Sequence, residues 1–257
     1  EYRVEPMHTP VNTVYSVSTI CDETLVLSVR ECLASYLGVV PYDRALRLQQ
    51  ALLTARAEGR IPDILLLLQH PPAFTLGRFK GEEDIIVPPE MLTREGIAVF
   101  HTNRGGSVTY HGPGQLIGYP VMNLKEKGLG ARRYIWNLEE VVIMFLHTIG
   151  IQGHRVADHR GVWVGNKKIC SVGVNVSRGI STHGFALNVS NDLHYFQYIR
   201  PCGLAGEMMT SMSELSGHSI EMETVVSDAI HCFSEVFGLG CKRRDDACLA
   251  ILGALGG

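Results

Sequence analysis

One cysteine of this 257-residue chain stands in a setting that suits a nucleophile. Cys202 lies between Pro201 and Gly203, so a fixed φ on one side and a permissive backbone on the other place its thiol on a sharp turn. A nucleophilic cysteine needs such exposure, together with a positive neighbour that lowers its pKa. A small buried residue in a turn would have the same surroundings, and the motif alone leaves both interpretations open.

A lysine that could carry protons stands at Lys168. The dipeptide Gly165-Asn166 predicts a two-residue hairpin turn, and Lys168 begins the strand that follows, at 168–176. A partly desolvated lysine on a rigid strand has a lowered pKa and can exchange protons near neutral pH. Alternatively, the two adjacent lysines only solvate the turn, which we expect of Lys167.

The segment 104–115 carries four glycines and a proline beside an arginine, a histidine and a glutamine. Glycine permits positive φ and lets a ligand approach the backbone, although a tight β-turn with incidental polar neighbours fits equally well. The segment is neither a P-loop nor a dinucleotide fingerprint, because the required ending and the strand–helix setting are absent. A second segment, 182–188, could wall a narrow acyl slot or form an ordinary core strand.

Hydrophobic periodicity places these motifs on a β-rich framework with a few long helices. The predicted helices are 42–57, 88–94, 131–149 and 221–237. The predicted strands are 64–69, 74–76, 99–101, 107–111, 116–122, 161–164, 168–176 and 184–189. Because several strands follow one another directly, we expect an α/β chain of the α+β type, with helices packed on a mixed sheet.

The expected organisation is an N-terminal extension at 1–35, one catalytic domain at 36–238 and a C-terminal tail at 239–257. Hydrophobic residues make up 46% of the chain and charged residues 19%, as in ordinary globular domains. A net charge of −3 argues against general nucleic-acid binding, and no apolar run is long enough to span a membrane.

The cysteine count bears on metals and on the compartment. Seven cysteines without a Cys-x-x-Cys pair argue against a disulfide scaffold and against a zinc ribbon, so we expect no metal site. We expect a cytoplasmic protein with mostly inert thiols. Since the chain begins at Glu1 rather than at methionine, a mitochondrion or plastid is the alternative.

Taken together and in this order, the motifs resemble those of the lipoyl(octanoyl) transferase family, over about residues 37 to 215. The resemblance rests on Leu68-Gln69-His70-Pro71-Pro72, Thr75-Leu76-Gly77, 104–115, Tyr119-Pro120, 161–164, Lys168-Ile169, 182–188, Pro201-Cys202-Gly203 and Thr210-Ser211. Each motif alone means little, whereas the ordered set is highly specific.

The resemblance implies a fold, an activity and partners. The implied fold is the biotin/lipoate protein ligase-like catalytic core. The implied activity is the transfer of an octanoyl group from octanoyl-acyl carrier protein to a lysine of lipoyl domains, the first step of protein lipoylation, without ATP, another cofactor or a metal. The acceptors would be lipoyl domains of 2-oxoacid dehydrogenase complexes and the glycine cleavage H protein, and we expect a monomer.

The resemblance also assigns site residues. The family's nucleophile, which holds the acyl group as a thioester, falls on Cys202, and its proton-handling lysine falls on Lys168. The substrate-binding residues would be Arg104, Gly105, Gly106, Tyr110, His111, Gly112, Ser171, Val172, Gly173, His183, Gly184 and Ala186. A docking patch for acidic partners, or simply a solvated charged face, could form from Arg78, Lys80, Lys125, Lys127, Arg132 and Arg133.

Three other functions stay open. An ATP-dependent lipoate or biotin ligase on the same core would also use a lysine near Lys168, but it would not need Cys202. A non-catalytic module that binds lipoyl domains or acyl chains is disfavoured because both residues are present. A cysteine hydrolase would need a catalytic histidine, and neither His218 nor His231 stands in a motif that indicates this role.

Overall fold

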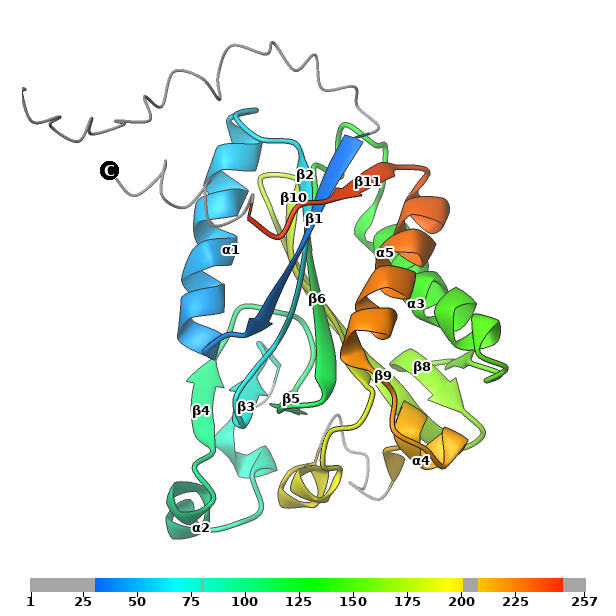
Figure 1. Cartoon of the computed structure of the whole chain (residues 1–257). Helices are drawn as coiled ribbons and strands as arrows, with labels where there is room; N and C mark the ends of the chain where they lie inside the picture. Colours follow the sequence, from blue (N-terminus) through cyan, green and yellow to red (C-terminus); the bar gives the residue numbers. More distant parts are fainter. Residues whose placement is uncertain (1–30, 80, 201–207, 247–257) are drawn as a thin grey trace, which may run out of the picture.

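The computed structural model describes residues 31–79, 81–200 and 208–246. Within these residues, the centre is an eight-stranded mixed sheet between two layers of helices (Figure 1). From one edge to the other, its strands are β11 (Gly240–Arg243), β1 (Glu31–Val39), β2 (Asp63–Gln69), β6 (Gln115–Val121), β10 (Ile180–Asn188), β9 (Lys167–Ser177), β8 (His159–Val164) and β7 (His154–Val156). Strands β11, β1 and β2 run parallel, and the other neighbours are antiparallel. The predicted mixed sheet is confirmed.

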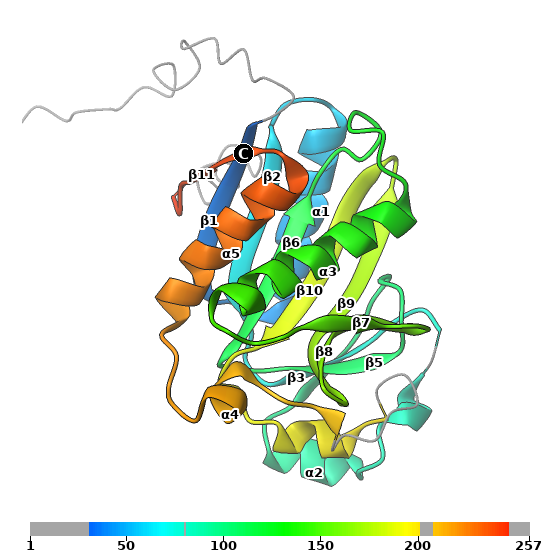
Figure 2. The same cartoon turned by 90° about the vertical axis from the view of Figure 1, so that its right-hand side faces the viewer.

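The helices bury both faces of this sheet. Helix α1 (Tyr42–Ala57) covers one face, and α3 (Ala131–Thr148) and α5 (Met222–Phe237) lie side by side on the other (Figures 1 and 2). In β2, Leu66 belongs to the core cluster under α1, whereas Leu65 and Leu67 belong to the cluster under α3 and α5. A strand buried on both faces has no polar side to display, which explains the continuous apolar run in β2.

A smaller sheet lies at one end of the large one, in the lower part of Figure 1. It has the order β4 (Ala98–His101), β3 (Ala73–Leu76) and β5 (Val108–His111), with β4 parallel and β5 antiparallel to β3. The short helices are α2 (Pro89–Arg94), α4 (Met212–Ser216) and the 3-10 turns η2 (Glu82–Asp84) and η3 (His194–Tyr198). None of the helices in the described ranges has the length and apolarity to cross a membrane.

The large sheet extends beyond the predicted domain limits at both ends. β1 begins at Glu31, within the segment expected to be an extension, and β11 lies in the segment expected to be a tail. The two strands pair with each other, and the hydroxyl of Ser35 donates a hydrogen bond to the backbone oxygen of Arg244 at 2.5 Å. Pairing between distant segments thus places both strands in the domain.

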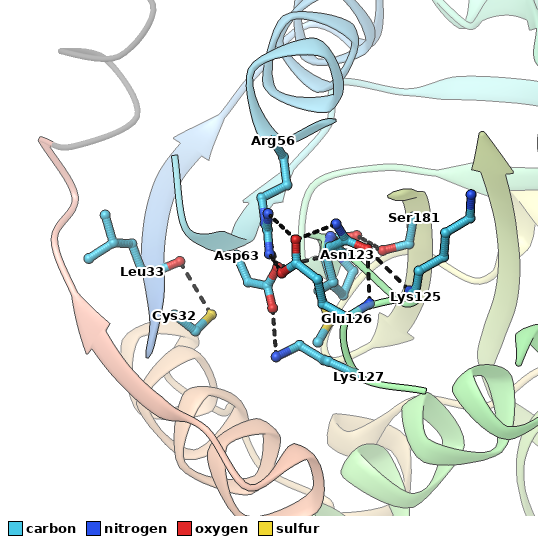
Figure 3. Close-up of polar contacts among 11 residues, drawn as sticks. Cys32, Leu33, Arg56, Asp63, Asn123, Lys125, Glu126, Lys127 and Ser181 are labelled. Atoms are coloured by element: carbon cyan, nitrogen blue, oxygen red, sulfur yellow. Dashed lines mark hydrogen bonds and ion pairs between the residues drawn. The ribbon is translucent and has the colours of Figure 1, made fainter. Parts of the chain in front are cut away.

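A buried ion cluster holds the start of β2 (Figure 3). The carboxylate of Asp63, 2% exposed, accepts hydrogen bonds from Arg56 Nε at 2.8 Å and from the Asn123 amide at 3.0 Å, and it pairs with Lys127 Nζ at 2.9 Å. Arg56 also pairs with Glu126, and its hydrogen bond holds the pKa of that carboxyl below its usual value. Lys127 therefore forms a largely buried ion pair with Asp63 and is not one of the surface cations expected for the docking patch.

This cluster predicts a large effect for Asp63→Asn. The variant removes the charge that two buried cations share, and we expect the free energy of unfolding to fall by about 3–5 kcal/mol in urea denaturation. Asp43→Asn is the matched control because its ion pair with Arg47 is solvent-exposed, and its unfolding midpoint should hardly change. Equal effects of the two substitutions would contradict this account.

Candidate active site

A cavity of about 300 Å³ lies between the large sheet and the loop that follows β4. Its wall consists of Tyr42, Phe79, residues 104–109, His111, Tyr119, residues 158–160, Lys168, residues 171–173 and residues 183–186. The structure thus brings together Lys168 and ten of the twelve residues that the sequence predicts to bind substrate, although they come from three separate segments of the chain.

The glycine-rich loop is held by contacts between backbones. The Gly105 amide donates a hydrogen bond to the backbone oxygen of Val174 in β9 at 3.0 Å. A Cβ atom on Gly77, just after β3, would lie 2.2 Å from the oxygen of Gly106, and one on Gly173 would lie 3.0 Å from the oxygen of Gly105. Gly106 itself has a φ of +91°. The glycines therefore let the loop fit between β3 and β9.

Arg104 fixes this loop to the small sheet. Its side chain is buried, and Nη2 donates to the backbone oxygen of Thr75 at 2.5 Å and to the Thr75 hydroxyl at 2.8 Å. Nη1 donates to the backbone oxygen of Gly105 at 3.1 Å. The guanidinium therefore contributes a positive charge to the cavity wall while it holds the loop in place.

His111 belongs to a chain of buried hydrogen bonds. The amide nitrogen of Gln115 donates to Asn188 Oδ1 at 2.9 Å, so Gln115 Oε1 accepts from His111 Nδ1, also at 2.9 Å. His111 Nε2 then accepts from the Thr75 hydroxyl at 3.3 Å. Burial lowers the pKa of His111 well below its usual value, so the ring is neutral. At the far end, Asn188 Nδ2 donates to the backbone oxygen of Thr210 at 3.0 Å.

Lys168 is 6% exposed and lies where this hydrogen-bond chain ends. Its backbone oxygen accepts from the Thr210 amide at 3.0 Å, and the residue forms a parallel bridge with Met209. Its Nζ atom lies 5.7 Å from the ring centre of Trp163. A Cβ atom on Gly161, whose φ is +119°, would lie 2.7 Å from Lys168 Cε. Gly161 thus leaves room for the lysine side chain.

His183 has an unusual backbone for a strand residue, with a φ of +56°. Its amide donates to Gln49 Oε1 at 2.7 Å, and its Nε2 donates to Asn103 Oδ1 at 2.8 Å. Burial, together with Arg104 and Arg78, lowers its pKa to about 3. Its Nδ1 is then a buried acceptor in the cavity wall, and it has no hydrogen-bond partner among the described residues.

Two of the predicted site residues that the structure describes, Tyr110 and Gly112, are not in the cavity wall. Cys202 lies outside the described residues. Tyr110 packs instead against Phe74 and Phe196 in the core of the small sheet. Gly112 packs against this tyrosine, and a Cβ atom on Gly112 would lie 2.0 Å from the Tyr110 hydroxyl.

Several wall residues had no signal that would assign them to a site. Tyr42 is the first residue of α1, and its ring stacks on His111 with a centroid distance of 5.9 Å. Tyr119 belongs to the motifs of the family resemblance, and no other pattern assigns it to a site. Phe79 follows β3 and is 73% exposed. An exposed aromatic residue directly after a strand could have been recognised as a candidate for binding.

The model of the lipoyl protein ligase A/B catalytic domain matches residues 41–234. The chain belongs to this family. An octanoyltransferase of Alkaliphilus metalliredigens is 44% identical over 202 residues, which is 78% of this chain and 93% of that protein. A mitochondrial octanoyltransferase of Arabidopsis thaliana is 40% identical over 205 residues, which is 78% and 86%. The predicted relation to lipoyl(octanoyl) transferases is confirmed.

Solved structures confirm the fold of this lipoyl protein ligase A/B domain. Lipoate-protein ligase A bound with ATP has a TM-score of 0.69 at 18% identity, covering 88% of this chain and 94% of that chain. A bipartite lipoate protein ligase of Thermoplasma acidophilum has a TM-score of 0.68 at 17% identity, covering 88% and 92%. The lipoate ligase-like core predicted from the sequence is therefore present.

The backbone contacts of this lipoyl protein ligase A/B domain predict different outcomes for two alanine substitutions. Gly77→Ala places a methyl group against the backbone oxygen of Gly106, which cannot rotate away, and should lower the free energy of unfolding by about 1–3 kcal/mol. In Gly105→Ala the new methyl group meets nothing closer than 3.6 Å, and stability should change by less than about 0.5 kcal/mol. Chemical denaturation of both variants tests the contact, and a stable Gly77→Ala protein would contradict it.

A third buried imidazole, that of His70, makes stability depend on pH. His70 Nδ1 donates to the backbone oxygen of Val40 at 2.6 Å, and Nε2 accepts from the Tyr119 hydroxyl at 2.9 Å. Burial lowers the pKa of His70 to about 4. In the unfolded chain the pKa of a histidine is about 6.5, so between about pH 6.5 and 4 His70 is protonated in the unfolded chain but neutral in the folded one. The free energy of unfolding therefore decreases as the pH falls through this interval.

We expect His70→Gln to reduce this pH dependence. The wild-type free energy of unfolding should fall by about 2–3 kcal/mol between about pH 7.5 and 4.5 on account of His70 alone. The variant should be less stable at neutral pH but should lose less over the same interval, as measured by urea denaturation at several pH values. Parallel pH curves for the two proteins would show that His70 is not responsible.

Proposed function

We propose that this chain is an octanoyltransferase that carries the octanoyl group on Cys202 and uses Lys168 to move protons. In this proposal, the donor is octanoyl-acyl carrier protein and the acceptor is a lysine of a lipoyl domain. The observation that carries the proposal is the identity of 40–44% to proteins named octanoyltransferase, in a chain whose cavity wall contains a buried lysine. ATP is not required, because the acyl group arrives as a thioester.

The residues beside the Pro201-Cys202-Gly203 segment support this role for Cys202. On one side, the Arg200 amide donates to the backbone oxygen of Asp84 at 2.8 Å, and the Asp84 carboxylate accepts from the hydroxyl of Ser107, a wall residue, at 2.6 Å. On the other side, Met209 pairs with Lys168. Arg200 and Met209, on the two sides of the segment, are therefore each linked to a residue of the cavity wall, which supports a nucleophile near that wall.

The first half of the proposed reaction is a thioester exchange. Lys168 takes the proton of the Cys202 thiol, and the resulting thiolate attacks the acyl carbon. The bond to the carrier's sulfur then breaks, and Lys168 gives the proton to the departing sulfur. The two thioesters are similar in energy, so this exchange is nearly balanced. The tetrahedral intermediate needs hydrogen-bond donors for its oxyanion, and the Gly184 amide in the cavity wall and the Gly203 amide are candidates.

The second half forms an amide. The lysine amine of the lipoyl domain attacks the Cys202 thioester, the carbon–sulfur bond breaks, and Lys168 accepts the proton that the amine loses. Because an amide is more stable than a thioester, this half is downhill. The acceptors we propose are lipoyl domains of 2-oxoacid dehydrogenase complexes and the glycine cleavage H protein, with the enzyme acting as a monomer.

The small residues of β9 and β10 suit an acyl chain. Ser171, Gly173, Gly184 and Ala186 all belong to the cavity wall. Burying about seven carbons at about 0.8 kcal/mol each would offer roughly 5 kcal/mol of binding energy. One methylene more or less would change the selectivity only about 10-fold or somewhat more, so we expect a preference for octanoyl rather than strict exclusion of its neighbours.

The compartment we propose is the cytoplasm. Four cysteines in the described part of the chain, namely Cys32, Cys170, Cys232 and Cys241, are free thiols, as expected in a reducing environment. The Arabidopsis thaliana relative is named as mitochondrial, which keeps an organelle as the alternative.

The intact mass of the protein tests the covalent mechanism. After incubation with octanoyl-acyl carrier protein, we expect one octanoyl adduct that hydroxylamine removes and that moves to an added apo lipoyl domain. The Cys202→Ser variant should form no such adduct. Transfer that requires free octanoate and ATP, with no adduct, would favour a ligase. Binding of the lipoyl domain without turnover would favour a non-catalytic module.

The adjacent lysine provides a matched control for Lys168. Lys168→Ala should lower the rate of octanoyl transfer by about 10²- to 10⁴-fold, as expected for the loss of a general acid–base group. Lys167 pairs with Glu214 at 2.8 Å and does not line the cavity, so Lys167→Ala should change the rate by less than about threefold. Similar rates for the two variants would overturn the role proposed for Lys168.

A further inference from the structure

Two cysteines face each other at an edge of the large sheet, away from the residues of the cavity wall. Cys32 in β1 and Cys241 in β11 are direct partners in the register of these parallel strands. Paired residues of neighbouring strands point to the same face and lie about 4.8 Å apart. A disulfide needs Cα atoms about 4.4–6.8 Å apart, so the strand pairing alone brings both residues within bonding range.

Packing confirms that both side chains lie on the same face. Cys32 belongs to the core cluster under α3 and α5, and Cys241 packs against that cluster. The two thiols lie close enough to shift each other's pKa, and Ser234 of α5 lies close enough to lower the pKa of Cys241. The buried Asp63, which Figure 3 shows near Cys32, lies close enough to act electrostatically on both thiols.

The two thiols differ in exposure and in acidity. Cys32 is 1% exposed, and its interaction with the Cys241 thiol, together with burial, raises its pKa well above the usual value. Cys241 is partly exposed, and the same interaction lowers its pKa. An accessible, more acidic thiol beside a protected one is the arrangement that favours oxidation at the first sulfur and resolution by the second.

We propose that Cys32 and Cys241 are a redox-active pair that hydrogen peroxide converts to a disulfide between β1 and β11. In the first step, the Cys241 thiolate attacks peroxide and becomes a sulfenic acid, and hydroxide leaves. In the second step, the Cys32 sulfur attacks the sulfenic sulfur, the S–S bond forms, and water leaves. Two thiols are oxidised by two electrons and one peroxide is reduced, so the steps balance.

The disulfide would tie together segments that are far apart in the sequence. It would join strands whose neighbouring residues Ser35 and Arg244 are separated by 209 positions. A cross-link over such a long loop restricts the unfolded chain strongly, whereas the folded strands are already adjacent. We therefore expect oxidation to raise the thermal midpoint by about 5–10 °C.

Peptide mapping tests the pair in the full-length protein. After treatment with hydrogen peroxide and alkylation of the remaining thiols, combined digestion with trypsin and endoproteinase Glu-C releases residues 32–44 and 236–242, each with a single cysteine. We expect a disulfide-linked species of these two peptides that dithiothreitol separates, together with the higher thermal midpoint.

Single substitutions provide the controls. Cys241→Ser should remove the linked species and the rise in midpoint, and Cys32→Ser should leave Cys241 as a sulfenic acid that dimedone traps. Cys232→Ser is the matched control, because Cys232 is buried in α5 with a raised pKa, and the link should form in it as in the wild type. Peroxide-treated folded protein in which Cys32 and Cys241 stay unlinked, or in which Cys241 links to Cys248 instead, would overturn the proposal.

Discussion

Backbone contact between the loop at 104–107 and the two sheets beside it determines where the cavity lies. A Cβ atom on Gly77 would lie only 2.2 Å from the oxygen of Gly106, and one on Gly173 would lie 3.0 Å from the oxygen of Gly105. Since backbone atoms cannot move aside like the end of a side chain, a larger residue at Gly77 forces the backbone to shift, and one at Gly173 makes a tight contact. The buried Arg104 then holds the loop from within, and the remaining space between loop and sheet is the cavity.

Two buried histidines of this region, His70 and His111, are neutral and fully hydrogen-bonded. Burial penalises the charged forms of both imidazoles, and each uses both ring nitrogens in hydrogen bonds. A network in which every buried polar group has a hydrogen bond avoids the free-energy cost of burying unpaired groups. It also fixes the orientation of the side chains that form it. Through Asn188 and Thr210, that arrangement extends from the glycine-rich loop to the backbone of Lys168.

Short sequence patterns predict the helices, strands and turns that depend mainly on neighbouring residues. Helix α1 and strand β2 follow from periodicity and from a continuous apolar run, and the two-residue turn before β9 follows from its glycine. The sequence does not predict strands β1, β7 and β11, because β1 mixes small and polar residues with apolar ones and the other two are short and contain one apolar residue each. Tyr42 and Tyr119 reach the cavity only through the packing of distant segments, which no local pattern records.

The parallel pairing of β1 with β11 has a consequence for synthesis of the chain. β1 leaves the ribosome before any other strand of the large sheet, whereas its outer neighbour β11 leaves after all of them. While the nascent chain grows, the outer row of amides and carbonyls of β1 stays unpaired, and such an edge invites pairing with other chains. β11 therefore covers this edge only after translation has passed it, so the edge of β1 is exposed for most of the synthesis of the chain.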